Sequence, residues 1–135
     1  MCSSDLMKII GLRYFNVYGQ HQDPSGPYAA VIPLFMDAVL NHKEAWINGD
    51  GLQTRDFTHV SNAVQANIRA LFTDNDEAFG RIYNVAVGES ITVNQLFDEI
   101  ASIAGKEMKP HHRSDRPGDV RSSLADISQI GRAHV

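Results

Sequence analysis

The stretch Gly11-Leu-Arg-Tyr-Phe-Asn-Val-Tyr-Gly19 decides the fold that we expect for this chain. Residues 8–15 are mostly apolar and rich in β-formers, which predicts a short strand, and residues 16–26 have the composition of a loop. Asn16 would therefore follow a strand end. Ligands of open α/β sheets bind outside the carboxyl ends of the strands, so an amide there could donate to a phosphate or a sugar hydroxyl. An Asn that only caps a turn fits the same pattern.

Two further polar clusters each contain an arginine, Thr54-Arg55-Asp56-Phe57 and Arg116-Pro117-Gly118-Asp119. A guanidinium presents a planar fork of donors that matches two phosphate oxygens at a time, so these clusters and Asn16 suggest one anionic ligand site. The alternative is a plain ion pair, Arg55 with the adjacent Asp56 and Arg116 with Asp119. For either arginine taken alone, the ion pair is the better expectation.

Four motifs occur in the order that is typical of the extended short-chain dehydrogenase/reductases, in particular the NAD-dependent epimerase/dehydratases. They are Arg13-Tyr14-Phe15-Asn16, Gly49-Asp50-Gly51 with Thr54-Arg55-Asp56-Phe57, Tyr83-Asn84-Val85-Ala86-Val87-Gly88, and Arg116-Pro117-Gly118-Asp119-Val120-Arg121. Residues 8–128 resemble the C-terminal half of that family. The resemblance implies an α/β fold: the last sheet strands of an NAD(P)-binding Rossmann-type domain plus a small substrate-binding subdomain, in truncated form.

Within the family the chain resembles the UDP-N-acetylglucosamine 4-epimerases most. The segments that carry this likeness are Gln22-Asp23-Pro24, Tyr28-Ala-Ala-Val-Ile-Pro33 and Gly118-Asp119-Val120-Arg121 with Ser123-Leu124-Ala125-Asp126. The resemblance implies that Phe15 lies against the nicotinamide of NAD. It implies that Asn16, Arg55 and Arg116 hold the diphosphate of a UDP-sugar and that Asp119 accepts from a ribose hydroxyl. The implied walls of the uracil pocket are Ala30, Val31, Trp46, Ile47 and Asn48.

Ser123 bears on the choice of substrate. In galactose-type epimerases of the family a bulky Tyr occupies the matching position and closes the pocket to an N-acetyl group. The small side chain of Ser123 would leave room for that group, so the resemblance implies a parent enzyme that accepts N-acetylated UDP-hexoses. The alternative is an ordinary Ser at the N-terminus of a helix that opens near Asp126.

The catalytic parts of the family's mechanism do not occur in this sequence. It contains neither a Gly-rich pyrophosphate turn nor a Tyr followed by Lys at the required spacing, and we expect both to precede Met7. Residues 1–6 and 130–135 resemble translations of a sequencing-library adapter read in opposite directions. We therefore expect residues 7–129 to be the natural part, a substrate-binding fragment with no catalytic residue of its own, flanked by non-native ends.

Composition excludes several classes of function. The 135 residues have a net charge of −4 with scattered Lys and Arg, which argues against nucleic-acid binding. The single cysteine, Cys2, lies in the adapter-like start, and no apolar run approaches membrane-spanning length. No histidine pair has the spacing of a metal site, and His59 is expected to be structural. A cytoplasmic enzyme without a metal and without a membrane segment fits these features.

Periodicity and capping signals predict helices over residues 29–42, 60–72 and 92–104, strands over 45–48 and 82–87, and an extended piece through Phe57. Residues 110–116 are predicted to be a loop, followed by a helix that opens near Asp126. Thr92 with Gln95 predicts a capping box, and Gly105 a helix stop. The apolar faces expected to be buried are Val31, Leu34, Phe35, Ala38 and Val39; Val64, Ile68 and Leu71; and Leu96, Phe97, Ile100 and Ile103.

The sequence is therefore interpreted as the UDP-sugar-binding half of an NAD-dependent UDP-hexose 4-epimerase, whose parent is expected to be a homodimer. Two alternatives stay open. One is a nucleotide-sugar 4,6-dehydratase or decarboxylase of the same family, and the other is a nucleotide-binding module without activity.

Overall fold

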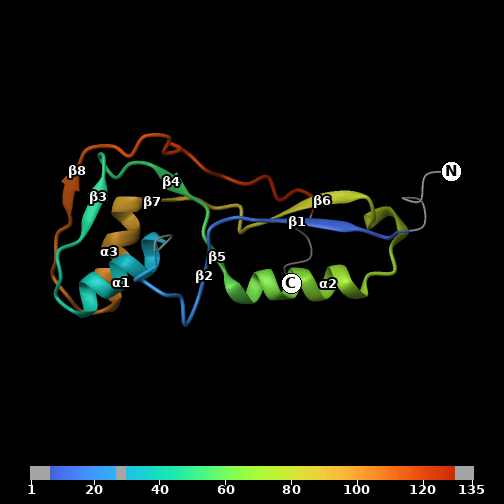
Figure 1. Cartoon of the computed structure of the whole chain (residues 1–135), viewed down its shortest axis with the longest axis horizontal. Coiled ribbons are helices and arrows are strands. Elements are labelled where there is room, and N and C mark those ends of the chain that lie inside the picture. The colour runs from blue at the N-terminus through green and yellow to red at the C-terminus, as the bar shows by residue number, and fades with distance from the viewer. Residues whose placement is uncertain (1–6, 27–29, 130–135) are drawn as a thin grey trace. The chain divides into compact units, whose positions relative to one another are not determined.

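A computed structural model describes residues 7–26 and 30–129 (Figure 1). The elements are β1 (Ile10–Tyr14), β2 (Val17–Tyr18), α1 (Val31–Leu40), β3 (Trp46–Asn48), β4 (Thr54–Arg55), β5 (Thr58–His59), α2 (Val60–Phe72), the short 3₁₀ helix η2 (Asp76–Ala78), β6 (Arg81–Val85), β7 (Ile91–Thr92), α3 (Val93–Ile103) and β8 (His111–Arg113). The predicted α/β class is confirmed. Tyr28, Ala29 and the two predicted adapter-like ends lie outside the described residues, so the predicted boundaries at residues 7 and 129 remain predictions.

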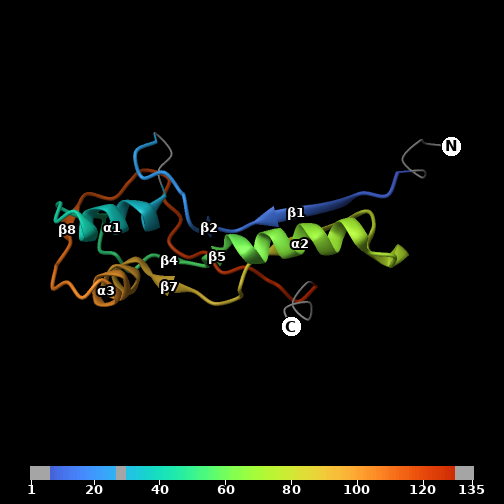
Figure 2. The same cartoon turned by 90° about the horizontal axis from the view of Figure 1, so that it is seen from below.

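The chain divides into two units, and the first comprises Met1–Gly19, Asp56–Glu89 and Ala125–Val135. In it β1 and β6 run parallel, from Ile10 opposite Arg81 to Tyr14 opposite Val85. The helix α2 packs along this pair (Figures 1 and 2). Because the two strands are parallel, their carboxyl ends lie at the same edge. A second short parallel pair, β2 with β5, involves the residues that follow this edge.

The apolar face of α2 corrects one prediction. The helix has the expected bounds, but Val64, Ile68 and Leu71 are 49%, 45% and 76% exposed, and its buried residue is Ala63. Apolar periodicity identifies a helix face suited to burial, but not the element that covers it. Two strands are too narrow to cover that face.

The second unit comprises Gln20–Arg55 and Ser90–Leu124. Its core lies between α1 and α3, where the rings of Phe35 and Phe97 meet edge to face with centroids 5.3 Å apart. The capping box of Thr92 and Gln95 is confirmed. Gly105 follows α3 with a φ of +66°, which confirms the predicted stop. Leu34 and Ile103, predicted to be buried, are 46% and 83% exposed. The buried residues are instead Pro33, Phe35, Ala38 and Val39 in α1 and Val93, Leu96, Phe97 and Ala101 in α3.

Short strands complete this unit. β4 pairs antiparallel with β7, and β3 pairs parallel with β8. The predicted loop over residues 110–116 is therefore wrong in part, because His111–Arg113 form a strand. Its polar side chains carry no strand signal; backbone bonds fix it, from His111 N to Ala45 O (2.8 Å) and from Gly49 N to Arg113 O (2.7 Å). The predicted helix near Asp126 is also absent through Gln129, where the described residues form only a turn.

Candidate functional site

Asn16 stands at the carboxyl edge of the β1–β6 pair, as predicted. The pairing continues one step past β1, where Phe15 N donates to Val85 O (3.1 Å). Asn16 then turns the chain with a φ of +37°, a left-handed conformation that Asn tolerates better than most residues. Its Nδ2 donates to Asp56 O (3.0 Å), and its carbonyl accepts from Thr58 N (3.2 Å). The amide keeps a second N–H and its Oδ1, so it could still meet a ligand.

Asp56 lies at the same edge and is fully buried. Its two carboxylate oxygens accept from the backbone of the segment after β6, from Val87 N at 3.1 Å and Gly88 N at 2.9 Å. The carboxylate thus holds the ends of two sequence segments together with charge-assisted bonds. The predicted pairing of Asp56 with Arg55 is wrong, and this structural role went unseen because its partners lie 31 and 32 residues further along the chain.

In the second unit Arg55 pairs with Asp119. Its Nη2 contacts Asp119 Oδ1 in a short ion pair, and its Nη1 donates to Thr54 O at 2.7 Å. The Arg55 side chain is only 16% exposed. Arg116 begins the turn that carries Asp119, whose N–H donates to Arg116 O at 3.1 Å. The predicted ion pair of Arg116 with Asp119 is therefore replaced by one between Asp119 and Arg55.

Ser123 lies beside β4 and caps no helix, since residues 123–127 have no regular structure. Its N–H donates to Thr54 O (3.1 Å), and Thr54 N donates to Arg121 O (3.0 Å). The Thr54 hydroxyl also donates to the hydroxyl of Ser122 at 3.0 Å. Residues 121–123 therefore extend along β4, and the half-buried Ser123 stands next to the strand that leads to Arg55.

The predicted uracil-pocket residues fall on β3 and at the start of α1. Trp46 is 45% exposed and stacks on His111 with ring centroids 5.0 Å apart, whereas Ile47 is 1% exposed. Side chains alternate along a strand, so Trp46 and Asn48 share one face and Ile47 points to the core. Ile47 could therefore meet a ligand only through its backbone. Ala30 is the residue before α1, and Val31 is its first residue; both are half-buried.

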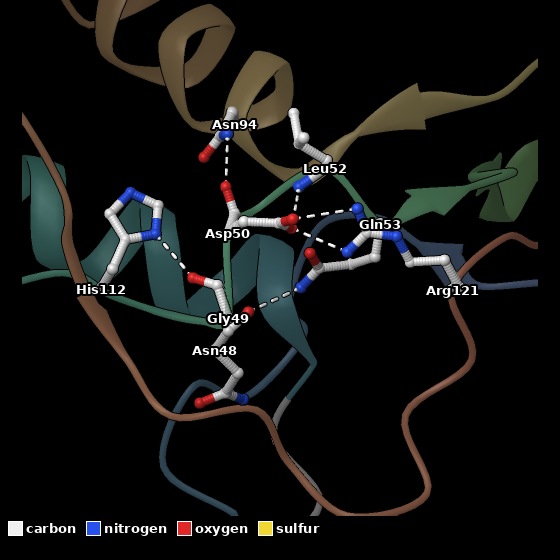
Figure 3. Close-up of polar contacts among 8 residues, drawn as sticks. All are labelled: Asn48, Gly49, Asp50, Leu52, Gln53, Asn94, His112 and Arg121. Carbon is white, nitrogen blue, oxygen red and sulfur yellow. Dashed lines mark hydrogen bonds and ion pairs between the residues drawn. The ribbon is translucent and has the colours of Figure 1, made fainter.

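The turn of Asn48 to Gln53 holds a polar network that the sequence did not reveal (Figure 3). Arg121 binds both carboxylate oxygens of Asp50, at 2.8 and 2.9 Å. The hydrogen bonds from Arg121, with that from Leu52 N, lower the pKa of Asp50 to about 2. The pair was missed because its members are 71 residues apart in the sequence.

The histidines make no metal site among the described residues, which contain no group of three or more side chains able to hold an ion. His59 has the structural role that was predicted: it precedes α2, and its Nδ1 accepts from Ser61 N at 3.2 Å. Within the same residues, none of the helices is both long and apolar enough to cross a bilayer.

The residues expected at one diphosphate belong to different units, Asn16 to the first and Arg55 and Arg116 to the second. Their convergence on a single ligand remains a prediction. Within the second unit, the structure does bring together Arg55, Asp119 and the segment that carries Ser123.

Several known proteins are similar to this chain in sequence, and one of them is a solved structure with a similar fold. A UDP-N-acetylglucosamine 4-epimerase from Methanobrevibacter ruminantium, solved in complex with UDP-N-acetylmuramic acid, is 41% identical with a TM-score of 0.89, and the match covers 98% of this chain and 42% of that one. A UDP-glucose 4-epimerase from Mycolicibacterium smegmatis is 36% identical over 82% of this chain and 34% of its own. A UDP-N-acetyl-alpha-D-glucosaminuronate decarboxylase from Bacillus cytotoxicus is 37% identical over 75% of this chain and 30% of its own.

The chain thus spans about a third of the length of these curated relatives. The model of the NAD dependent epimerase/dehydratase family matches residues 1–86, which is more than half of the chain. Because this family model matches more than half of the chain, and because the relatives agree with it, the chain belongs to the NAD dependent epimerase/dehydratase family.

Proposed function

We propose that this chain is the UDP-sugar-binding part of a longer enzyme, its parent, which interconverts UDP-N-acetylglucosamine and UDP-N-acetylgalactosamine at C4. The observation that carries the proposal is the assembly around β4. Arg55 meets Asp119, which lies 64 residues further along the chain, and the adjacent segment that carries Ser123, all in one unit. A half-buried guanidinium paired with a single carboxylate keeps donors that a diphosphate could take up.

In this proposal the Arg55–Asp119 pair rearranges when the substrate binds. Arg55 turns its fork to the diphosphate with Arg116, and Asp119 accepts from a ribose hydroxyl. The exposed Trp46 and the half-buried Asn48 face the uracil together with Ala30 and Val31, and Ile47 contributes its backbone.

The residues present also fit NAD, the cofactor of the family. Phe15 is half-buried at the carboxyl edge of two parallel strands, where open α/β sheets bind their ligands, and it offers an aromatic ring for the nicotinamide. When bound, NAD would take hydride from the sugar and return it. The residues of this chain would bind and orient the nucleotide sugar, while the acid/base groups belong to the rest of the parent. We further propose a cytoplasmic, homodimeric parent, and sedimentation of that protein tests the dimer.

A larger side chain at position 123 tests which UDP-sugar the parent accepts. In the parent, Ser123→Tyr should fill the room left for the acetamido group. We expect it to lower kcat/KM for UDP-N-acetylglucosamine by about 100-fold or more and to change that for UDP-glucose by less than about threefold, because a clash acts only on the larger sugar. Ser102→Tyr, on an exposed position of α3, is the matched control for adding a Tyr. Equal kcat/KM values of the wild type and Ser123→Tyr for both sugars would contradict the proposal.

A decarboxylase is the second candidate, because one relative of comparable identity is a UDP-N-acetyl-alpha-D-glucosaminuronate decarboxylase. Incubation of the parent with the corresponding UDP-sugar acid separates the two functions. Release of carbon dioxide identifies a decarboxylase, whereas a 4-epimer of UDP-N-acetylglucosamine identifies the epimerase. If the parent binds UDP and converts neither substrate, a nucleotide-binding module without activity is favoured.

A further inference from the structure

Asp50 is the centre of a cluster that joins three segments of the second unit (Figure 3). Its carboxylate binds Arg121 through two hydrogen bonds and also accepts from Leu52 N at 2.9 Å. Its backbone carbonyl accepts from Asn94 Nδ2, at 2.9 Å, at the start of α3. The 49–51 turn, the first turn of α3 and the segment at Arg121 are therefore tied to one residue.

The turn itself is held in place from several sides. Asn94 N donates to Gly51 O (3.0 Å), and Gln53 Nε2 donates to Asn48 O (2.9 Å). Gly51 has a φ of +74°, and a Cβ there would stand 2.0 Å from Asn94 Oδ1, so only glycine fits. Asp50 is thus presented by a fixed turn, which makes it a firm anchor for a second segment.

Arg121 connects the fixed turn at Asp50 to the residues proposed to bind the substrate. Its backbone carbonyl accepts from Thr54 N, and two residues later Ser123 N donates back to Thr54 O. Two residues earlier, Asp119 pairs with Arg55. The Arg121 side chain therefore fixes the segment midway between Asp119 and Ser123.

We infer that Asp50 and Arg121 are positioning residues for the UDP-sugar site: they hold residues 119–123 along β4, so that Asp119 and Ser123 are in place before the substrate binds. This inference rests on the proposed function. The pair is exposed, with side chains 50% and 63% accessible, and exposed ion pairs add little to overall stability. A forked pair between two planar groups, however, fixes orientation. The pair therefore orders residues 119–123 locally and adds little to the overall stability of the unit.

Amide hydrogen exchange of the 135-residue chain tests the order of the segment without any ligand. Arg121→Met keeps the length of the side chain and removes the fork, and Asp50→Asn keeps an acceptor for Leu52 N. We expect each to speed exchange at Thr54 and Ser123 by roughly fivefold, with the unfolding midpoint unchanged, since local opening is separable from global unfolding. Because both variants break the same contact between Asp50 and Arg121, the double variant should exchange no faster than either single variant.

Lys43→Met is the matched control. Lys43 forms another exposed ion pair of the same unit, with Asp37 at 2.9 Å, and it contacts none of the segments at Arg121. Its removal should leave the exchange of Thr54 and Ser123 unchanged. If the two amides are unprotected in the unmodified chain, or if Arg121→Met speeds their exchange no more than Lys43→Met does, the inference is overturned.

Kinetics of the parent test the link to the substrate. Arg121→Met should raise KM for UDP-N-acetylglucosamine by about fivefold and leave kcat within about twofold, because the pair orders the binding site and touches no reacting atom. Arg121→Lys should restore part of the loss. Changed exchange with an unchanged KM overturns the positioning role. Absence of UDP-sugar binding in the wild-type parent, with the exchange result as expected, instead overturns the proposed function.

Discussion

At the scale of single residues, two polar side chains with structural roles hold the edge that follows β1 and β6. Asp56 satisfies two backbone N–H groups while fully buried, and Asn16 turns the chain at a positive φ. A buried polar group that loses its hydrogen-bond partner is costly, so Asp56 and Asn16 stabilise this edge whether or not a ligand binds. A role for Asn16 at a diphosphate must therefore coexist with this structural one.

Substitution of Asn16 separates its conformation from its hydrogen bond. Asn16→Ala loses the bond to Asp56 O and also places a Cβ residue at a φ of +37°, so we expect it to lower the free energy of unfolding by about 1–2 kcal/mol. Asn16→Gly loses the same bond but tolerates the φ, and should cost about 1 kcal/mol or less. Urea unfolding of the chain measures both. Equal losses for the two variants would show that the backbone conformation contributes nothing.

At the scale of elements, the sequence predicted those features that depend on residues close together in the chain. The bounds of α2 and the capping box of α3 follow from neighbouring residues, and both predictions are confirmed. The strand β8 was not predictable, because its polar residues are placed by backbone bonds to Ala45 and Gly49, more than sixty residues away. The prediction of the ion pairs was wrong for the same reason. Adjacency suggested that Arg55 pairs with Asp56, whereas its partner, Asp119, lies 64 residues further along the chain.

Shortening an apolar side chain should have a larger effect on α3 than on α2. Phe97 on α3 is fully buried against Phe35, so Phe97→Ala should lower the free energy of unfolding by about 3–5 kcal/mol through lost contacts and a cavity. Ile68 on α2 is 45% exposed, and Ile68→Ala should cost about 1 kcal/mol or less. Urea unfolding monitored by circular dichroism compares them. A loss at Ile68 as large as that at Phe97 would mean that another surface covers α2 in solution.

At the scale of the whole molecule, carboxylates in both units prefer the charged state in the folded chain. Hydrogen bonds or ion pairs lower the pKa of Asp76 and Asp126 in the first unit and of Asp23, Asp37 and Asp50 in the second. The largest cause for Asp76 is Lys8, and that for Asp126 is the N–H of Ser128. All five side chains lie at the surface, so each alone contributes little to the stability of the fold. Because all five pKa values are lowered, their contributions have the same sign.

Stability of the chain should therefore fall in acid. A group whose folded pKa lies below its unfolded value, about 3.9 for Asp, stabilises the fold above that value and loses this contribution as pH falls through the folded pKa. We expect the urea midpoint to be flat from about pH 5 to 8, to fall below about pH 4, and to fall further toward pH 2 as Asp50, with its pKa of about 2, becomes protonated. Asp50→Asn should weaken the last part of this decline, because its carboxylate is absent at every pH. High salt should reduce the part of the decline that comes from Asp37, Asp50 and Asp76, because it screens their ion pairs. An equal midpoint at pH 7 and pH 3 would contradict the lowered pKa values.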